Sequence, residues 1–304
     1  HGYEVVGTVR SASKTAPTTS AIATVAPVDN LSYAEADLLS DTGWDEAMAG
    51  CTYVIHVASP FVMAEPKDEK ELITPAVDGT KRVVQAAQRA GVSRMVLTSS
   101  TFAMIAGKDS GRYGPDSWSD TDADIGAYAK SKTLAERAAW DINGNDTMEL
   151  TVINPGGVSG PPLNAQADSS SVAMMSDMIN GKMPMLPDLA LNMVDVRDVA
   201  RLHVTALTAP RAEGQRFIAA TSEPVEFATT AAILKQAGYS KVSTRKAPTV
   251  VLRLMSLFSR EAKGLLPMLG KKITLDTTST SEILEWQPTS MEDSVMDMAA
   301  SLSK

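Results

Sequence analysis

The sequence predicts an α/β fold, with a doubly wound parallel sheet and a smaller, mostly helical lobe attached to it. Short apolar runs alternate with helix-like stretches through the first half of the 304-residue chain, a pattern typical of βαβ units. The runs are apolar at most positions, as parallel strands are when both faces of their sheet are buried. The second half has a different, mainly helical pattern, which predicts the second lobe.

The expected elements of the sheet follow one another along the first half of the chain. Strands are expected over residues 3–9, 52–58, 94–98 and 149–153. Helices are expected over residues 44–49, 71–90 and 127–142. Gly91 follows the second of these helices directly, where a helix C-cap favours glycine. The small and polar residues 11–30 are expected to form a loop or a frayed helix.

The pattern changes after residue 160. A Pro/Ser-rich loop, a Met-rich stretch, a helix and a short strand are expected in turn over 160–170, 174–185, 195–207 and 216–220. We therefore expect a sheet domain over 1–160 and a smaller lobe over 161–304, with parts of about 191–222 returning to the sheet domain.

The charge and the cysteine content argue against several classes of protein. The chain has 28 Lys and Arg against 36 Asp and Glu, a net charge of −8, so a nucleic-acid partner is not expected. No apolar stretch approaches the roughly 20 residues that span a bilayer, so no membrane partner is expected either. The single cysteine, Cys51, suits a reducing compartment and a cytoplasmic location. The three histidines are scattered, so no metal site is expected, and His56, inside an apolar strand, is interpreted as structural.

Tyr128 and Lys132 form the strongest local signal for chemistry. They are four residues apart on an expected helix and therefore lie on one face of it. A phenol has a pKa near 10, and a neighbouring ammonium lowers that pKa, so the pair would make a usable general acid. The alternative is an exposed helix face that happens to carry a tyrosine.

A run of hydroxyl side chains, Thr98 to Thr101, closes the apolar strand over 94–98. Ligands of open α/β sheets bind outside the carboxyl ends of the strands, so these hydroxyls could hold a substrate carbonyl. The alternative is a polar turn that caps the following helix. The combination of Ser, Tyr and Lys favours the first interpretation.

These residues belong to a longer set of segments that resembles the extended short-chain dehydrogenases/reductases. The branch that it resembles contains the dihydroflavonol reductases, the cinnamoyl-CoA reductases and the fungal aldehyde/ketone reductases. The matching segments are GYEVVGTVR (2–10), ADLLSD (36–41), GCTYVIHVASP (50–60), VDGT (77–80), RMVLTSS (94–100), YAKSKTLAE (128–136), INPGGVSGP (153–161), VDVRDVA (194–200) and LEWQP (284–288). The resemblance implies a Rossmann-like sheet domain and a soluble NADP-dependent oxidoreductase.

The resemblance also implies catalytic roles. Tyr128 would donate the proton to the carbonyl oxygen, and Lys132 would hold the nicotinamide ribose and lower the pKa of Tyr128. Ser100 would orient the substrate carbonyl, with Thr101 as the alternative. The cofactor would supply the hydride, and the protein would supply positioning and electrostatics.

Cofactor choice is predicted from Arg10, at the end of the first expected strand. Relatives that prefer NAD place an acidic residue there, whereas arginine suits the 2′-phosphate of NADP(H), and Lys14 could assist. The alternative is a solvated basic residue at a strand end. The resemblance implies further cofactor contacts at Asp37, Leu38, Val57, Ala58, Ser59, Pro155, Gly156 and Val158.

The chain departs from the family pattern at its beginning. The family starts with a strand, a G-x-x-G-x-x-G turn that binds the pyrophosphate, and a helix. No such turn precedes the strand over 3–9, so we expect a first βα unit of about 25 residues to be missing before His1.

Candidates for the substrate pocket are Phe61, Met63 and Phe102, which suggest a mostly apolar carbonyl compound. Flavonoid reductases carry asparagine where Ile105 stands, and the residues before Tyr128 lack the Asn-Trp-Tyr-Cys stretch of cinnamoyl-CoA reductases. The expected function is therefore NADPH-dependent reduction of a range of aldehydes or ketones, by a monomer or a homodimer. The alternatives are an NAD-dependent sugar-nucleotide epimerase or dehydratase of the same family, and a dinucleotide-binding protein without turnover.

Overall fold

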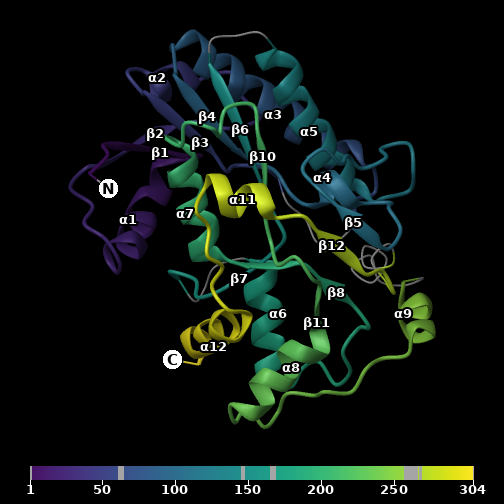
Figure 1. Ribbon diagram of the computed structural model, residues 1–304. Coiled ribbons are helices and arrows are strands. Elements are labelled where there is room, and N and C mark those ends of the chain that lie inside the picture. The colour runs from purple at the N-terminus through teal and green to yellow at the C-terminus, as the bar shows by residue number, and fades with distance from the viewer. Residues whose placement is uncertain are drawn as a thin grey trace.

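The computed structural model describes residues 2–60, 65–144, 148–164, 169–256, 266 and 269–303. Strands and their flanking helices make up the upper part of Figure 1, and a mostly helical lobe makes up the lower part. Among the helices of these ranges, none combines the length and the apolar character that crossing a membrane requires.

The central sheet has four parallel strands in the order β10–β6–β4–β3. They are β3 (Tyr53–His56), β4 (Arg94–Thr98), β6 (Glu149–Pro155) and β10 (Arg216–Ala219). Alternate residues of β4 face opposite sides: Met95 and Leu97 join one core cluster, and Val96 joins the other. Both faces of the sheet are therefore buried, which confirms the fold class that the apolar runs predict.

Helices cover both faces of this sheet. Residues of α2 (Trp44–Met48), α3 (Lys70–Arg89) and α5 (Ala127–Asn143) pack into one core cluster with Met95. Residues of α7 (Val196–Ala206) pack into the other cluster with Val96. The long helices lie within a residue or two of their expected ranges, because the apolar stripes that predict them are the faces that are buried.

A second, two-stranded parallel sheet stands apart from the first. It consists of β1 (Val5–Val9) and β2 (Leu31–Glu35), connected by the 3₁₀ helix η1 (Ala12–Lys14) and by α1 (Thr15–Ala23). Within the described residues β1 does not pair with β3, and Val5, Val6 and Ile55 on these strands are more than a third exposed. Helix α1 and strand β2 lie in or beside the segment that the sequence predicts as a loop or frayed helix.

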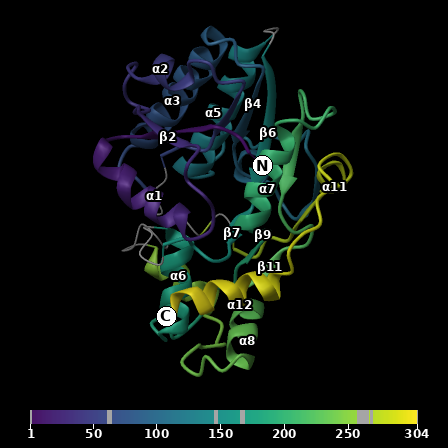
Figure 2. The same ribbon diagram turned by 90° about the vertical axis from the view of Figure 1, so that its left-hand side faces the viewer.

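The lobe contains α6 (Ser170–Ile179), α8 (Phe227–Gln236) and α12 (Met291–Leu302). Met175, Met178 and Met298 are buried in its core. In Figures 1 and 2 α7 lies between the central sheet and these three helices. The remaining elements are α4 (Phe102–Ile105), β5 (Gly111–Tyr113), β7 (Gly157–Ser159), β8 (Ala190–Leu191), β9 (Met193–Asp195), β11 (Val225–Glu226), α9 (Thr249–Met255), β12 (Ile273–Leu275) and α11 (Thr278–Ile283).

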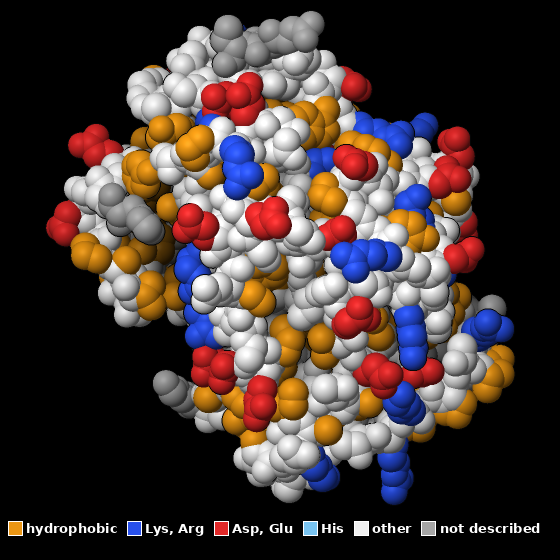
Figure 3. Space-filling view, viewed as in Figure 1, with side chains coloured by type: hydrophobic (Ala, Val, Ile, Leu, Met, Phe, Trp, Pro, Cys, Tyr) orange, Lys and Arg blue, Asp and Glu red, His pale blue; other side chains and the backbone are white. Residues whose placement is uncertain are grey.

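Short strand pairs connect the lobe with the sheet region. Strand β7 continues directly from β6 and pairs in parallel with β9, which leads into α7. Figure 3 shows acidic and basic side chains interspersed over the face of Figure 1. This face therefore has no large field of a single sign.

Candidate active site

The turn that carries Ser100 is fixed at the carboxyl end of β4 by strand β6. The Ser99 amide donates to the Ile153 carbonyl at 2.8 Å, and the Thr101 amide donates to the Pro155 carbonyl at 2.9 Å. The side-chain amide of Asn154 donates to the Ser100 carbonyl at 3.2 Å. Three hydrogen bonds to one strand leave this turn little freedom, which suits a residue that must orient a substrate.

Tyr128 lies in the first turn of α5, where it meets Ser100. Gly126 precedes the helix with a φ of 80°, a left-handed conformation that glycine adopts without strain. The side chains of Tyr128 and Ser100 are hydrogen-bonded to each other. The ring of Phe102 packs edge-on against the ring of Tyr128, with centroids 5.9 Å apart. Three of the predicted site residues are therefore in contact.

The pKa of Tyr128 differs in direction from the sequence prediction. Burial raises the pKa of the phenol, and the hydrogen bond with Ser100 only partly offsets this. The net shift is upward, so the expectation of a lowered pKa is wrong for this structure, and the contribution of Lys132 stays a prediction. The i, i+4 spacing was correct, but it carries no information on how deeply the phenol is buried.

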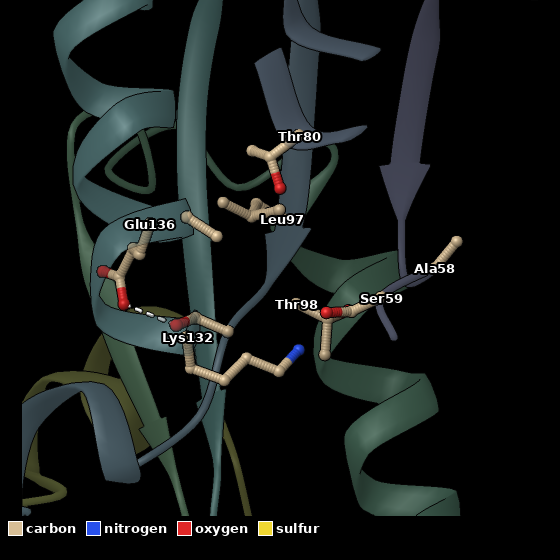
Figure 4. Close-up of a pocket in the computed structure, with 9 residues that line it drawn as sticks. Ala58, Ser59, Thr80, Leu97, Thr98, Lys132 and Glu136 are labelled. Carbon is tan, nitrogen blue, oxygen red and sulfur yellow. Dashed lines mark hydrogen bonds between the residues drawn. The ribbon is translucent and has the colours of Figure 1, made fainter. Parts of the chain in front are cut away.

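Lys132 lies one helical turn after Tyr128 and is only 8% exposed. Burial lowers the pKa of its ammonium to about 8, against an opposing contribution from Glu136 that raises it. Its amine lies in a small cavity between α5, α3 and the ends of β3 and β4 (Figure 4). The cavity is lined by Ala58, Ser59, Thr80, Leu97, Thr98, Ser99, Lys132, Ala135 and Glu136.

Four of these lining residues were not singled out by the sequence analysis, namely Thr80, Leu97, Ala135 and Glu136, whereas Thr98 and Ser99 belong to the predicted run of hydroxyl side chains. A signal for Glu136 was available, because it follows Lys132 by four residues and so lies on the same face of α5. Thr80 is the last residue of the VDGT segment in α3. Its proximity to Lys132 depends on how α3 packs against α5, which no local pattern specifies.

The predicted adenine-side residues lie around the two-stranded sheet and outside this cavity. Arg10 directly follows β1, Lys14 ends η1, and both side chains are exposed. Asp37 and Leu38 follow β2. The Leu38 carbonyl accepts a hydrogen bond of 2.8 Å from Arg82 of α3, which holds this loop against the helix.

The VDGT segment explains how this loop approaches α3 so closely. A Cβ on Gly79 would lie only 2.9 Å from the Cβ of Leu38, closer than real side chains come. Glycine at this position therefore lets Leu38 lie directly on the helix.

The remaining predicted cofactor contacts follow β3 and β6. Val57 is 60% exposed, beside Ala58 and Ser59 of the cavity. Pro155 ends β6 and Gly156 follows it, whereas Val158 packs against the core cluster of α7. Of the predicted substrate residues only Phe102 can be located, since Phe61 and Met63 lie outside the described residues.

The chain matches known proteins in sequence and in fold. The family model for the NAD dependent epimerase/dehydratase family matches residues 1–220. A cinnamoyl-CoA reductase of Medicago truncatula is 34% identical over 70% of this chain and 68% of its own. The crystal structure of Gre2 from Candida albicans in complex with NADPH matches with a TM-score of 0.80 and 27% identity, over 99% of this chain and 92% of that one.

A second solved structure agrees in fold. The yeast methylglyoxal/isovaleraldehyde reductase Gre2, complexed with NADPH, matches with a TM-score of 0.81 and 23% identity, over 99% of this chain and 91% of that one. The chain therefore belongs to the NAD dependent epimerase/dehydratase family, the extended short-chain dehydrogenases/reductases that its sequence motifs resemble.

Proposed function

We propose that this protein is an NADPH-dependent carbonyl reductase that converts aldehydes or ketones to alcohols. The observation that carries the proposal is the hydrogen-bonded pair of Ser100 and Tyr128, with the buried amine of Lys132 one helical turn away. The relatives support it, because they include a cinnamoyl-CoA reductase and a reductase solved with NADPH.

The hydroxyls of Ser100 and Tyr128 would converge on one carbonyl oxygen of the substrate. Burial keeps the phenol of Tyr128 protonated at neutral pH, so it is ready to donate. When bound, the reduced cofactor supplies the hydride that attacks the carbonyl carbon. Ser100 then stabilises the negative charge on the oxygen while Tyr128 delivers its proton to it. The edge of Phe102 gives this position an apolar wall, which suits an organic carbonyl compound.

The residues of the site fit a phosphorylated dinucleotide. The ammonium of Lys132 lies in the cavity, where it can bind ribose hydroxyls. The exposed guanidinium of Arg10 can bind a 2′-phosphate through charge-assisted hydrogen bonds. Val57, at 60% exposed and next in sequence to Ala58 and Ser59 of the cavity, offers apolar surface for a ring of the cofactor.

We further propose the division into a sheet domain over 1–160 and a lobe over 161–304, with parts of 191–222 returning to the sheet domain. Support comes from α7, which packs on the central sheet, and from β10, which is one of its strands, although both follow α6 of the lobe in sequence. A cytoplasmic monomer or homodimer is proposed with it, and light scattering of the purified protein would decide between the two states.

Loss of NADPH absorbance in the presence of a panel of aldehydes and ketones tests the proposed function. We expect turnover with NADPH, much weaker turnover with NADH, and almost none in the Tyr128→Phe variant. If no carbonyl compound is reduced, the proposal is wrong. Incubation with NAD and sugar nucleotides then tests the epimerase alternative, and NADPH binding without turnover would indicate a protein that only binds dinucleotides.

A further inference from the structure

Glu136 is a buried carboxylate in the middle of α5 and is 1% exposed. It accepts hydrogen bonds from side chains of four different segments. The donors are Ser99 after β4 at 2.5 Å, Asn154 of β6 at 3.0 Å, Arg216 of β10 at 2.6 Å and Trp140 of α5 at 3.3 Å. A carboxylate with this many donors stays ionised and fixed in place although it is buried.

The guanidinium of Arg216, which balances the charge of Glu136, is itself held from three sides. It donates to the carbonyls of Pro115 at 2.5 Å and Ser117 at 2.6 Å. It also stacks on the ring of Trp118, 3.9 Å from its centroid. This anchoring matters because a buried ion pair offsets its desolvation only when its geometry is good and its remaining donors are satisfied.

The hydrogen bonds of Glu136 lead directly to the reactive turn. Ser99, which donates to Glu136, precedes Ser100 in the chain, and Asn154 bonds both Glu136 and the Ser100 carbonyl. Figure 4 draws a hydrogen bond to Glu136 as a dashed line and shows that Glu136 lies on the same helix as Lys132. Helix α5 carries Tyr128 and Lys132, so Glu136 joins the segments that carry all three proposed catalytic residues.

We propose that Glu136 is a positioning residue for this reaction: its carboxylate ties the Ser100 turn to α5 and places a negative charge one helical turn from Lys132. The inference rests on the proposed reductase function for the roles of Ser100 and Lys132. Although Glu136 lines the cavity, its oxygens accept the hydrogen bonds of these four donors, which suits a positioning role.

The charges around Lys132 support an electrostatic role. Burial pulls the pKa of Lys132 down, and Glu136 opposes this. From β3, His56 faces Lys132, but burial and the ammonium together lower the pKa of its imidazole to about 4, so it is neutral at pH 7. Tyr128, from α5 itself, stays protonated, and Arg216 faces Glu136 from β10. Among the described residues Glu136 is therefore the negative group that keeps Lys132 charged.

The test compares Glu136→Gln with Glu136→Asp in the full chain. An NMR titration of the Lys132 side chain, assigned by its loss in Lys132→Arg, reads the electrostatic role without any turnover. In Glu136→Gln the titration midpoint of Lys132 should fall by about one pH unit or more, since a nearby opposite charge shifts a pKa by about that amount. In Glu136→Asp the Lys132 midpoint should stay near the wild-type value. The shorter side chain should displace the hydrogen bonds that hold the Ser100 turn, so kcat should fall roughly 10- to 100-fold.

A control variant separates this role from the stability that another arginine–glutamate pair on the central sheet contributes. Arg94 pairs with Glu149 at the opposite end of β4 and β6, far from the Ser100 turn. Glu149→Gln should lower the melting temperature without moving the Lys132 midpoint or the pH profile of kcat. A Lys132 midpoint in Glu136→Gln equal to that of wild type overturns the electrostatic role.

Two further outcomes keep the inference separate from the proposed function and from folding. If the wild type reduces no carbonyl compound, the proposed function fails, but the titration still decides whether Glu136 controls the charge of Lys132. If Glu136→Gln does not fold, Ser99→Ala removes a single hydrogen bond of the network. We expect about a tenfold lower kcat with an unchanged KM for NADPH, and an unchanged kcat would overturn the positioning role.

Discussion

Replacing Gly156 by alanine should destabilise the loop after β6 that is proposed to contact the cofactor. A Cβ there would lie 2.1 Å from the backbone oxygen of Asn192 and 2.9 Å from the Cβ of Ala220. Asn192 cannot easily move away, because its side chain donates to the carbonyls of Thr221, Ser222 and Ile273. The overlap is with anchored backbone, so we expect the upper end of the usual cost of overpacking, about 3 kcal/mol.

For a chain of this size that cost corresponds to a melting temperature lower by roughly 6 °C. Thermal unfolding followed by circular dichroism measures it, and the KM for NADPH should rise in the same variant. Gly114→Ala is the matched control, since the nearest atom to a Cβ at that position is 3.7 Å away. If Gly156→Ala melts with the wild type, the steric reasoning is refuted.

Four further predictions concern charge and protonation. Tyr128→Phe should lower kcat by roughly 100-fold or more, the contribution of a general acid, while NADPH still binds by fluorescence titration. Arg10→Gln should raise the KM for NADPH about tenfold and leave that for NADH unchanged, because only one cofactor has a 2′-phosphate for the guanidinium. Reduction should slow as the pH rises through about 8, where Lys132 loses its proton, and Lys132→Arg should remove this limb of the profile. Burial lowers the pKa of His56 to about 4, so the neutral imidazole contributes fully to the free energy of unfolding above pH 6.5. About 3 kcal/mol of this free energy of unfolding is lost as the pH falls towards 4. The stability of His56→Leu, measured by urea unfolding, should depend less on pH in this range.

The parts of the fold that could be predicted are those with a strong local pattern. The strand at 94–98 was predicted with its observed bounds, because all but one of its side chains are buried. Strand β2, with the sequence LSYAE, was missed because its polar side chains are exposed and it resembles a loop. Its pairing with β1 comes from the crossover through α1, a long-range contact that the local sequence does not encode.

The candidate site was likewise predictable only where local features of the sequence indicate it. Ser100, Tyr128 and Lys132 were predictable, since a strand end and an i, i+4 spacing are local features. The pKa direction of Tyr128 and the hydrogen bonds of Glu136 were not, because they arise from burial between segments distant in sequence. Arg216 illustrates this: it stands 80 residues after Glu136, in a strand where the sequence shows only an unremarkable basic residue.

The separation of β1 from β3 divides the proposed cofactor contacts between two sheets. Arg10 and Asp37 belong to the two-stranded one, and Ala58 and Ser59 follow the central one. The proposed contacts at Arg10 and Asp37 follow β1 and β2, whereas β4 is buried at four of its five positions and exchanges slowly with or without cofactor. A dinucleotide that contacts both parts would couple them, and at 100 times its Kd it would contribute about 2.7 kcal/mol. Amide hydrogen exchange in β1 and β2 would therefore slow on NADPH binding far more than exchange in β4, which makes this sheet a built-in reporter of cofactor occupancy.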